Sequence, residues 1–330
     1  MKPINTNEYQ KLADKSLDRG TIAPDDIRWI LSDDGVELLP LLHAAYRVRY
    51  AYFKNTVKIH ILNNVQSGNC SEDCKYCAQS KSSSNKTAIY PMKNEDEIME
   101  AARQAHTSGA YRHCMVFSGK DLGKAKIDRI CDVVKKIKEK FPMEICVSAG
   151  FLKEDDARRL VEAGVNRYNH NLNTSSNYYG QICTTHDYRQ RVQTIRTAKQ
   201  NGLDICSGVI IGMGETIDDI IQMTKELKAV EANSIPINFF IPVEGHRLEN
   251  YKTLTPHYCL KALCAFRFAI PHAEIRAAAG REHHLRSLQS LCLYPVNSIF
   301  AKGYLTTGGD AVAETQRMIT DSGFIVETIE

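Results

Sequence analysis

The chain has 330 residues, of which 43% are hydrophobic and 25% charged, the balance of a globular protein with a core. Its net charge of +3 and the lack of a charged tail argue against nucleic acid or a membrane surface as partner. No long apolar span predicts a membrane helix, and the first ten residues carry no secretory signal, so we expect a cytoplasmic protein. Eleven cysteines is a high and odd number, which indicates metal or redox chemistry rather than a disulfide framework.

A regular alternation of strand and helix is the main pattern of the chain. The segment from residue 8 to about 50 is predicted to be helical and to cap a larger unit. From residue 57 onward, short apolar runs alternate with longer segments of helical period. Strands are expected at 57–63, 112–118, 144–150, 167–173, 204–211, 235–243, 274–279 and 298–303. Helices are expected at 95–108, 124–140, 153–163, 187–201, 216–230, 255–270, 281–293 and 310–321.

Residues that favour helix ends agree with this pattern. Gly109, Gly164 and Gly202 each follow a predicted helix, where a left-handed residue is favoured. Asp187 and Thr216 stand where an N-cap is needed.

The count of strands and helices determines the predicted fold. Eight strands, each followed by a helix, are typical of an α/β protein built as a single (β/α)8 barrel of the TIM type. A doubly wound open sheet is the alternative architecture. No proline- or serine-rich linker divides the chain, so we predict an N-terminal helical extension over 1–50 and one barrel over 51–330.

A Cys-x-x-x-Cys-x-x-Cys motif is the most specific chemical signal. Cys70, Cys74 and Cys77 follow the first predicted strand, on a loop at the catalytic end of a barrel. Three thiolates at this spacing can hold three corners of a [4Fe–4S] cluster and leave one iron open, whereas ordinary clusters of this type take four cysteines. The alternatives are three unrelated buried thiols or a zinc site, but zinc needs a fourth protein group and usually a second Cys-x-x-Cys pair.

A second set of thiols lies within the predicted strands. Cys114, Cys146 and Cys206 fall on the second, third and fifth strands, and inward residues of different strands meet inside a barrel. Any one of these cysteines alone is better explained as a core residue. Arg276, on the seventh strand, would be a costly charge inside a barrel unless an anionic cluster neutralised it. The alternative is an arginine at the mouth of the barrel that binds a substrate carboxylate.

These motifs resemble those of known enzymes. The three-cysteine loop is similar to the signature of the radical S-adenosylmethionine (SAM) superfamily, in which the open iron binds SAM and one electron cleaves it to a 5′-deoxyadenosyl radical. Further segments resemble the biotin synthase family from about residue 57 to beyond residue 307: YNHNLNT (168–174), CSGVIIGMGE (206–215), PIN (236–238) and AGRE (279–282).

The resemblance implies a reaction and a second cluster. A biotin synthase inserts sulfur between two saturated carbons of dethiobiotin to form biotin. Unactivated C–H bonds resist acid–base chemistry, so a radical is required. The sulfur donor implied by the resemblance is a [2Fe–2S] cluster, held by Cys114, Cys146, Cys206 and Arg276.

The resemblance also implies the residues that bind SAM. Tyr76 is expected against the adenine and Arg191 at the SAM carboxylate, although loop packing and a solvated helix face are the alternatives for these two. Gly212 and Glu215 belong to the stretch that passes the adenine. Asn173 stands where the best-known form of the motif has aspartate, and it is kept as a binding residue because an amide still accepts a hydrogen bond.

Asn171 and Asn238 are expected to bind the ureido ring of dethiobiotin, because each amide offers a donor and an acceptor. Asn171 is also expected to contact SAM. The resemblance further implies a flavodoxin or ferredoxin as electron donor and a homodimer. The remaining cysteines are given no role: Cys131, Cys183, Cys259, Cys264 and Cys292.

Two other functions are considered. Another radical SAM barrel enzyme, such as a hydrogenase maturase or a methylornithine synthase, would retain the loop cysteines but has no reason to keep the whole strand set. A non-catalytic iron–sulfur or zinc protein would ligate its metal fully and would not need amides at 171 and 238. Cleavage of SAM by the reconstituted protein separates these classes.

Overall fold

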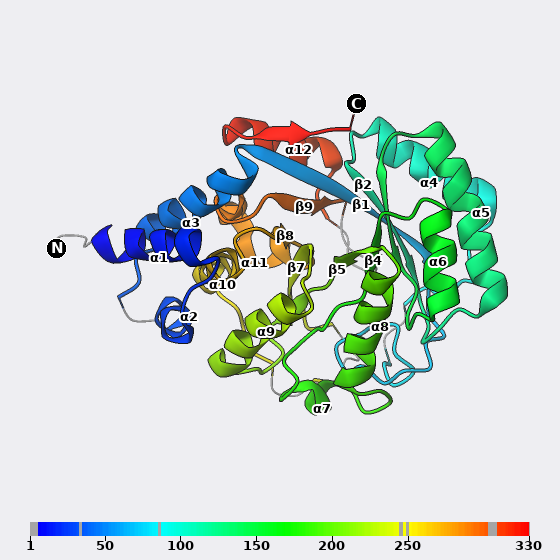
Figure 1. Cartoon of the computed structure of the whole chain (residues 1–330), viewed down its shortest axis with the longest axis horizontal. Coiled ribbons are helices and arrows are strands. Elements are labelled where there is room, and N and C mark those ends of the chain that lie inside the picture. Colours follow the sequence, from blue (N-terminus) through cyan, green and yellow to red (C-terminus); the bar gives the residue numbers. More distant parts are fainter. Residues whose placement is uncertain are drawn as a thin grey trace.

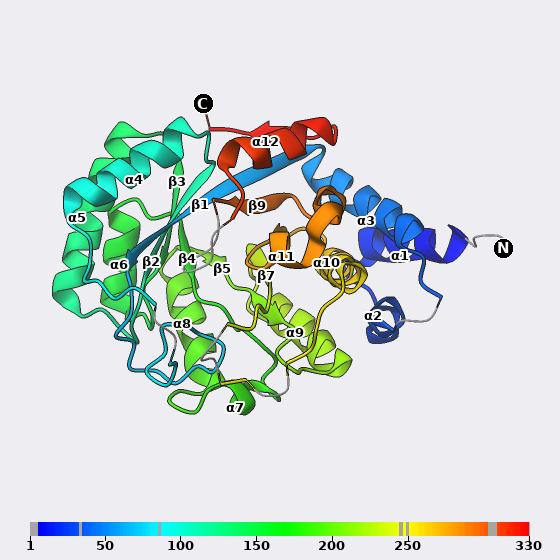
Figure 2. The same ribbon diagram turned by 180° about the vertical axis from the view of Figure 1, so that it is seen from behind.

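The fold is a closed barrel of parallel strands with helices outside it (Figure 1). The structure is a computed structural model and describes residues 6–32, 35–84, 87–243, 247–248, 251–302 and 309–329. Figure 2 shows that the N-terminal helices lie to one side of the barrel and that α12 packs along the edge where β10 joins the sheet. The predicted (β/α)8 architecture is confirmed.

The elements follow one another in the expected alternation. The strands are β1 (Thr56–Gln66), β2 (Arg112–Phe117), β3 (Glu144–Ser148), β4 (Arg167–Asn169), β5 (Asp204–Cys206), β6 (Val209–Ile211), β7 (Ser234–Phe239), β8 (Glu274–Ala277), β9 (Ser298–Ala301) and β10 (Ile325–Glu327). The helices are α1 (Thr6–Arg19), α2 (Pro24–Leu31), α3 (Leu38–Phe53), α4 (Glu95–Thr107), α5 (Lys124–Lys140), α6 (Glu154–Glu162), α7 (Tyr179–Ile182), α8 (Tyr188–Gln200), α9 (Ile217–Ala229), α10 (Pro256–Ala269), α11 (Arg281–Leu285), the 3-10 helix η1 (Arg286–Leu293) and α12 (Val312–Asp321).

A few elements differ from the prediction. The N-terminal helical segment is three helices, and α7 and β10 were not expected. The helix expected over 281–293 changes to a 3-10 helix at Arg286, whose φ of 51° is incompatible with a continuous α-helix. The strand expected over 204–211 is interrupted between β5 and β6. The end of the strand expected over 298–303 lies outside the described residues.

The sheet closes because its first and last barrel strands pair. The order is β10-β1-β2-β3-β4-β5-β7-β8-β9, all pairings are parallel, and β1 also pairs with β9 through Lys58 and Ser298. Within the break after β5, the backbone at Gly208 passes unusually close to β7. A Cβ on this residue would lie 1.9 Å from the carbonyl oxygen of Pro236, so the two backbones approach more closely than any side chain allows. Pairing with β7 resumes at Val209.

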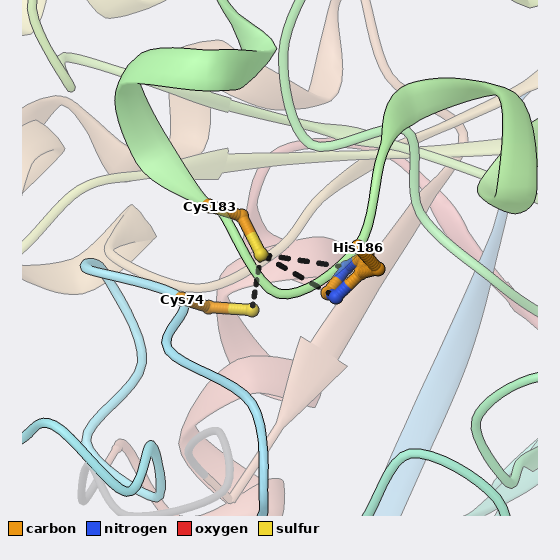
Figure 3. Close-up of side chains that lie close together, drawn as sticks. All are labelled: Cys74, Cys183 and His186. Carbon is orange, nitrogen blue, oxygen red and sulfur yellow. Dashed lines mark hydrogen bonds between the residues drawn. The ribbon is translucent and has the colours of Figure 1, made fainter.

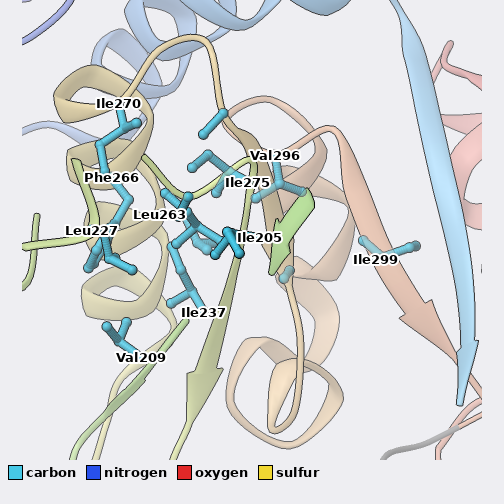
Figure 4. Packing of buried hydrophobic residues seen from close by; sticks show 14 of the residues in the cluster. Ile205, Val209, Leu227, Ile237, Leu263, Phe266, Ile270, Ile275, Val296 and Ile299 are labelled. Atoms are coloured by element: carbon cyan, nitrogen blue, oxygen red, sulfur yellow. The ribbon is translucent and has the colours of Figure 1, made fainter. Parts of the chain in front are cut away.

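Alternation along the strands separates two environments. Ile145 and Val147 of β3 belong to the large apolar core, whereas Cys146 between them packs with other cysteines inside the barrel. Figure 4 shows the outer layer, where Leu263 and Phe266 of α10 pack near Ile237 of β7. The helices therefore cover one apolar face of the sheet, and the other face is left for chemistry.

Buried arginine side chains attach the N-terminal helices to the barrel. Arg49 of α3 is fully buried and donates from Nε to the carbonyl oxygen of Val296 at 3.0 Å and from Nη2 to that of Thr56 at 2.7 Å. Burial lowers the pKa of Arg49 to about 10.

None of the described helices combines the length and apolar character that crossing a bilayer requires.

Gly208→Ala tests the close approach of β5 and β7. The added methyl group would overlap the Pro236 backbone, and we expect the free energy of unfolding to fall by about 3 kcal/mol or more. Urea unfolding of the cluster-free chain measures this change. Gly180→Ala is the matched control, because no atom lies within 4 Å of the position that its Cβ would take, and it should leave stability nearly unchanged. Equal midpoints for the two variants would contradict the steric explanation.

Candidate functional site

A cavity opens at the carboxyl ends of the strands and collects most of the predicted binding residues. Its wall is formed by the loop after β1, by the residues that follow β2, β3 and β4, and by the end of β7. The predicted residues that line it are Cys70, Cys74, Tyr76, Cys77, Asn171, Asn173, Arg191 and Asn238. This is the end of a TIM-type barrel at which catalytic groups are found.

The three-cysteine loop is fixed by hydrogen bonds on both flanks. The amide of Cys77 donates to the carbonyl oxygen of Cys74 at 3.1 Å, and that of Ser80 donates to the carbonyl oxygen of Cys77 at 3.1 Å. At the entry, the amide of Gly68 donates to Oε1 of Gln79 at 2.9 Å. Three thiols on a short, pinned turn are thereby directed into one cavity.

The donor set of this loop fits a [4Fe–4S] cluster with one open iron. Burial raises the pKa values of Cys70 and Cys77, so both remain thiols until a metal displaces the proton. Cys74 faces Cys183, with 3.7 Å between the two sulfur atoms. The loop itself supplies three thiols, one fewer than an ordinary [4Fe–4S] cluster takes, and Cys183 lies beside it as a fourth thiol that was not expected.

Tyr76 and Asn173 form one unit across the cavity. The amide nitrogen of Asn173 donates to the Tyr76 hydroxyl oxygen at 2.6 Å. Asn173 has a φ of 71°, a left-handed conformation that asparagine tolerates better than most residues. Its backbone also bridges to β6, with Ile210 donating to its carbonyl oxygen at 2.7 Å. An asparagine at this position can thus donate to Tyr76, which an ionised aspartate could not do.

The side-chain amides of Asn171 and Asn238 use some of their donor and acceptor positions within the protein and leave others for a ligand. The carbonyl oxygen of the Asn171 side chain accepts from Asn169 at 3.1 Å and from the Gly208 amide at 3.0 Å, which uses both of its lone pairs. Asn238 donates to the carbonyl oxygen of Val209 at 3.0 Å and accepts from the Ala279 amide at 3.1 Å. Asn171 therefore presents donors to a ligand, and Asn238 one donor and one acceptor.

Arg191 reaches the cavity from α8 and is not on a solvated face. Its Nε donates to the backbone oxygen of Asn171, and its Nη1 lies 3.2 Å from Nε2 of His186. The guanidinium stands beside the three-cysteine loop, where it offers a fixed positive charge to an anionic ligand group.

Gly212 and Glu215 lie next to the cavity rather than in its wall. The Gly212 amide donates to Oε1 of Glu215 at 2.7 Å, and burial raises the pKa of this carboxyl. Gly212 has a φ of 102° and its peptide oxygen accepts from the Lys252 amide at 2.9 Å. These residues build the turn after β6, and their contact with SAM stays a prediction.

The strand cysteines meet one layer below the cavity. Cys114, Cys146 and Cys206 form one buried cluster with Ala278 and Phe300. Their small pocket shares Val116, Ser148 and Asn169 with the wall of the main cavity, so the two spaces adjoin: it is lined by Leu62, Cys114, Met115, Val116, Cys146, Ser148, Asn169, Cys206, Pro236, Arg276 and Phe300.

Arg276 points at this thiol cluster. It is 1% exposed, and its Nη1 lies 3.7 Å from the sulfur of Cys206. A hydrogen bond from Cys146, with the positive charges of Arg276 and Arg112 behind it, lowers the pKa of the Cys114 thiol. Three buried thiols with a buried guanidinium are a donor set that fits a thiolate-bound, anionic iron–sulfur group.

A buried ion network supports Arg276 from below. Glu274 accepts from Nη2 of Arg276 at 2.5 Å and from Nη1 of Arg112 and of Arg167, each at 3.2 Å. Its carboxylate also lies 3.2 Å from Nε2 of His60. Burial alone would raise the pKa of the Glu274 carboxyl, but the charges of Arg112, Arg167 and Arg276 and the His60 ring together lower it well below its usual value. Ser234 completes the set with a hydroxyl 2.7 Å from Arg276.

Sequence reasoning missed several residues of the cavity. His186 lines it, and its Nδ1 lies 2.6 Å from Oε2 of Glu72. Cys183, for which no role was expected, ends α7 beside Cys74. No motif or period singles out these residues, because the loop between α7 and α8 brings them to the site only through the tertiary fold. Cys131, Cys259, Cys264 and Cys292 are buried in the apolar core, as a packing role predicts.

Comparison with protein families agrees with the fold and the loop. Residues 65–227 match the model of the Radical SAM superfamily, and residues 236–325 match the Biotin and Thiamin Synthesis associated domain. Together with the barrel and the three cysteines at its mouth, these matches define a radical SAM enzyme.

Curated relatives are more specific. The chain is 52% identical over 301 residues to a biotin synthase of Magnetococcus marinus, covering 91% of this chain and 94% of that protein. It is 44% identical over 324 residues to a biotin synthase of Bacillus licheniformis, covering 98% and 97%. The chain belongs to the biotin synthase family.

Solved structures share the fold at low identity. A methylornithine synthase superposes with a TM-score of 0.84 at 21% identity, covering 96% of this chain and 97% of that chain. A maturase of the [FeFe]-hydrogenase gives 0.83 at 16% identity, covering 99% and 76%. The barrel is therefore shared with proteins of other functions and does not by itself select a reaction.

Glu274→Gln tests the ion network under Arg276. Removing the shared carboxylate leaves buried cations unbalanced, so we expect the free energy of unfolding at pH 7 to fall by about 3–5 kcal/mol. Urea unfolding of the reduced, cluster-free chain measures the loss. Glu100→Gln, which removes an exposed partner of Arg103, is the control and should change stability little.

The stability lost in Glu274→Gln should also depend on pH. Because the folded-state pKa of Glu274 is lowered, its stabilisation is present above the usual carboxyl pKa of 4.5 and is lost as the pH falls below it. The difference in stability between the native chain and Glu274→Gln should therefore shrink in acid. A difference that stays constant from pH 7 to pH 3 would contradict the assignment.

Proposed function

We propose that this enzyme converts dethiobiotin to biotin with the two thiol sets of the barrel as its cluster sites. The observation that carries the proposal is their arrangement along one axis. The loop cysteines stand at the mouth, the strand cysteines lie in the adjoining pocket below, and amide side chains line the space between them. A substrate in the cavity would have one thiol set on each side.

The groups at the mouth fit SAM as a ligand. Cys70, Cys74 and Cys77 would hold a [4Fe–4S] cluster, which when bound supplies the electron that cleaves SAM to a carbon radical able to remove hydrogen from saturated carbon. Arg191 is charged and fixed by Asn171, so it can bind the SAM carboxylate. Tyr76, held by Asn173, offers an aromatic face and a positioned hydroxyl for the adenosine part.

The amides fit the ureido ring of dethiobiotin. A cyclic urea has one carbonyl acceptor and two N–H donors. Asn171 presents N–H groups that suit the carbonyl, and Asn238 keeps one acceptor position for a ring N–H. Because other protein atoms hold both side chains, these groups are oriented before the substrate binds.

The lower pocket fits a group that donates sulfur. Cys114, Cys146, Cys206 and Arg276 would hold a [2Fe–2S] cluster, and burial keeps this site away from water. Glu274 orients the Arg276 guanidinium toward Cys206 and balances part of its charge. A flavodoxin or ferredoxin as electron donor and a homodimer remain part of the proposal, and so does the cytoplasmic location expected from the sequence.

Cys74→Ala and Cys146→Ala separate the two sites. We expect Cys74→Ala to abolish SAM cleavage, because the mouth then lacks a cluster ligand. Cys146→Ala should retain cleavage to 5′-deoxyadenosine but form no biotin. Mass spectrometry of both products, after anaerobic reconstitution with iron and sulfide, reduction and addition of SAM and dethiobiotin, measures the two outcomes.

Cys292→Ser is the control, since this buried thiol lies in the apolar core and touches neither site. Biotin formation by Cys146→Ala would refute the strand cysteines as the sulfur site. Deoxyadenosine without biotin from the native enzyme would retain radical chemistry and reject the substrate, which is the result expected of a related radical SAM enzyme. Neither product, from protein shown to carry its clusters, would favour a non-catalytic iron–sulfur protein.

A further inference from the structure

Cys183 and His186 stand beside a cluster cysteine without a part in the proposed reaction. Cys183 ends α7, His186 lies just before α8, and both are buried. Figure 3 shows their side chains and that of Cys74 directed toward one another from two separate segments of the chain. Among the described residues, these three offer ligand atoms that all lie within 4.8 Å of one another.

Two of the three ligand pairs stand at the separations of a tetrahedral metal site. With zinc–sulfur bonds of about 2.3 Å and zinc–nitrogen bonds of about 2.0 Å, tetrahedral ligands stand about 3.8 Å apart for two sulfurs and about 3.5 Å apart for sulfur and nitrogen. The sulfurs of Cys74 and Cys183 are 3.7 Å apart. The sulfur of Cys183 lies 3.4 Å from Nδ1 and 3.7 Å from Nε2 of His186.

An outer carboxylate already orients the histidine. Nδ1 of His186 lies 2.6 Å from Oε2 of Glu72, the arrangement in which a carboxylate holds a metal-binding imidazole through its second nitrogen. If zinc binds through Nε2, the hydrogen bond between Nδ1 and Glu72 is kept. Tyr179 and Arg191, now 2.8 and 3.2 Å from Nε2, must then move away from this nitrogen. Two thiolates would neutralise a divalent cation and Glu72 offsets Arg191, while the carboxylate of Asp73, 3.3 Å from the Cys183 sulfur, adds one negative charge beside the site.

We propose that the cluster-free chain binds one zinc ion through Cys74, Cys183 and His186. Two thiolates and an imidazole are ligands that zinc prefers, and the fourth position is open to water. Cys74 belongs to both this site and the cluster loop, so the two metal groups exclude each other. Zinc therefore blocks loading of the iron–sulfur cluster at the mouth of the barrel. Zinc binding itself does not depend on the reaction proposed above, whereas the competition with the cluster rests on that proposed function.

Cobalt titration of the cluster-free chain tests the site. The full-length protein is stripped of iron anaerobically, and Co²⁺ binding is followed by its sulfur-to-cobalt charge-transfer absorption, with Zn²⁺ as competitor. The titration is made in a Cys114→Ser, Cys206→Ser background, which silences the strand thiols. We expect Cys183→Ser to weaken Zn²⁺ binding at least about tenfold, as even loss of an outer partner of a metal ligand does.

Matched variants decide between this site and the loop alone. Cys131→Ser, at a buried thiol of α5 remote from the cavity, should leave binding unchanged. Equal affinities for Cys183→Ser and Cys131→Ser would overturn the proposal, above all if Cys70→Ser weakens binding, because the ion would then sit on the three-cysteine loop. His186→Gln should weaken binding like Cys183→Ser, and circular dichroism checks that it folds.

Competition with cluster loading is the second readout. In the native chain, one equivalent of Zn²⁺ should slow the appearance of the [4Fe–4S] cluster absorption. In Cys183→Ser, the same amount of Zn²⁺ should have no such effect. Inhibition that persists in Cys183→Ser would overturn the proposed competition. Biotin formation is assayed separately on metal-loaded protein, so failure of the zinc site and failure of the proposed reaction give different results.

Discussion

The carboxylate of Glu274 ties together four strands of the barrel. It meets Arg112 from β2, Arg167 from β4, Arg276 from β8 and His60 from β1 inside a closed sheet from which water is largely excluded. Without this shared anion, the arginines would repel one another in a medium of low dielectric constant. With it, the floor of the barrel is held in one arrangement, and Arg276 directs its guanidinium toward the thiols above.

The chemical groups follow a fixed order along the barrel axis. At the strand cysteines, a hydrogen bond from Cys146 and the charges of Arg276 and Arg112 lower the pKa of Cys114, whereas hydrogen bonds between the thiols and burial raise those of Cys146 and Cys206. Above them, the amides Asn171 and Asn238 are neutral and already bonded to the backbone, so they can select a neutral ring by hydrogen bonds. Arg191 brings the next fixed charge, at the mouth. The chemical character of the site thus changes with depth, from thiols and a guanidinium below, through neutral amides, to a second guanidinium at the mouth.

The barrel and the three-cysteine loop could be predicted from the sequence, for identifiable reasons. Periodicity located the barrel strands because each is a short apolar run, and the loop cysteines were visible because their spacing is local. The close approach at Gly208 could not be predicted, since it depends on the Pro236 backbone of a neighbouring strand. The role of Glu274 was equally hidden, because its partners lie on other strands. Local patterns reveal local geometry, whereas contacts across the barrel need the fold.

Cys183 offers a second thiol to the three-cysteine loop and so makes it possible for another metal to bind there. A loop that holds an open iron has to keep its thiols free of other metals until the cluster arrives. Burial helps by raising the pKa values of Cys70 and Cys77, because protonated thiols bind cations poorly. The hydrogen bond with Cys183 and burial raise the pKa of Cys74 as well. This thiol differs from the other two because a second sulfur lies 3.7 Å away with an imidazole next to it. The arrangement that exposes Cys74 to the cavity therefore makes it the one loop thiol with a ready alternative ligand set among the described residues, and competition for this residue is where control over cluster loading would act.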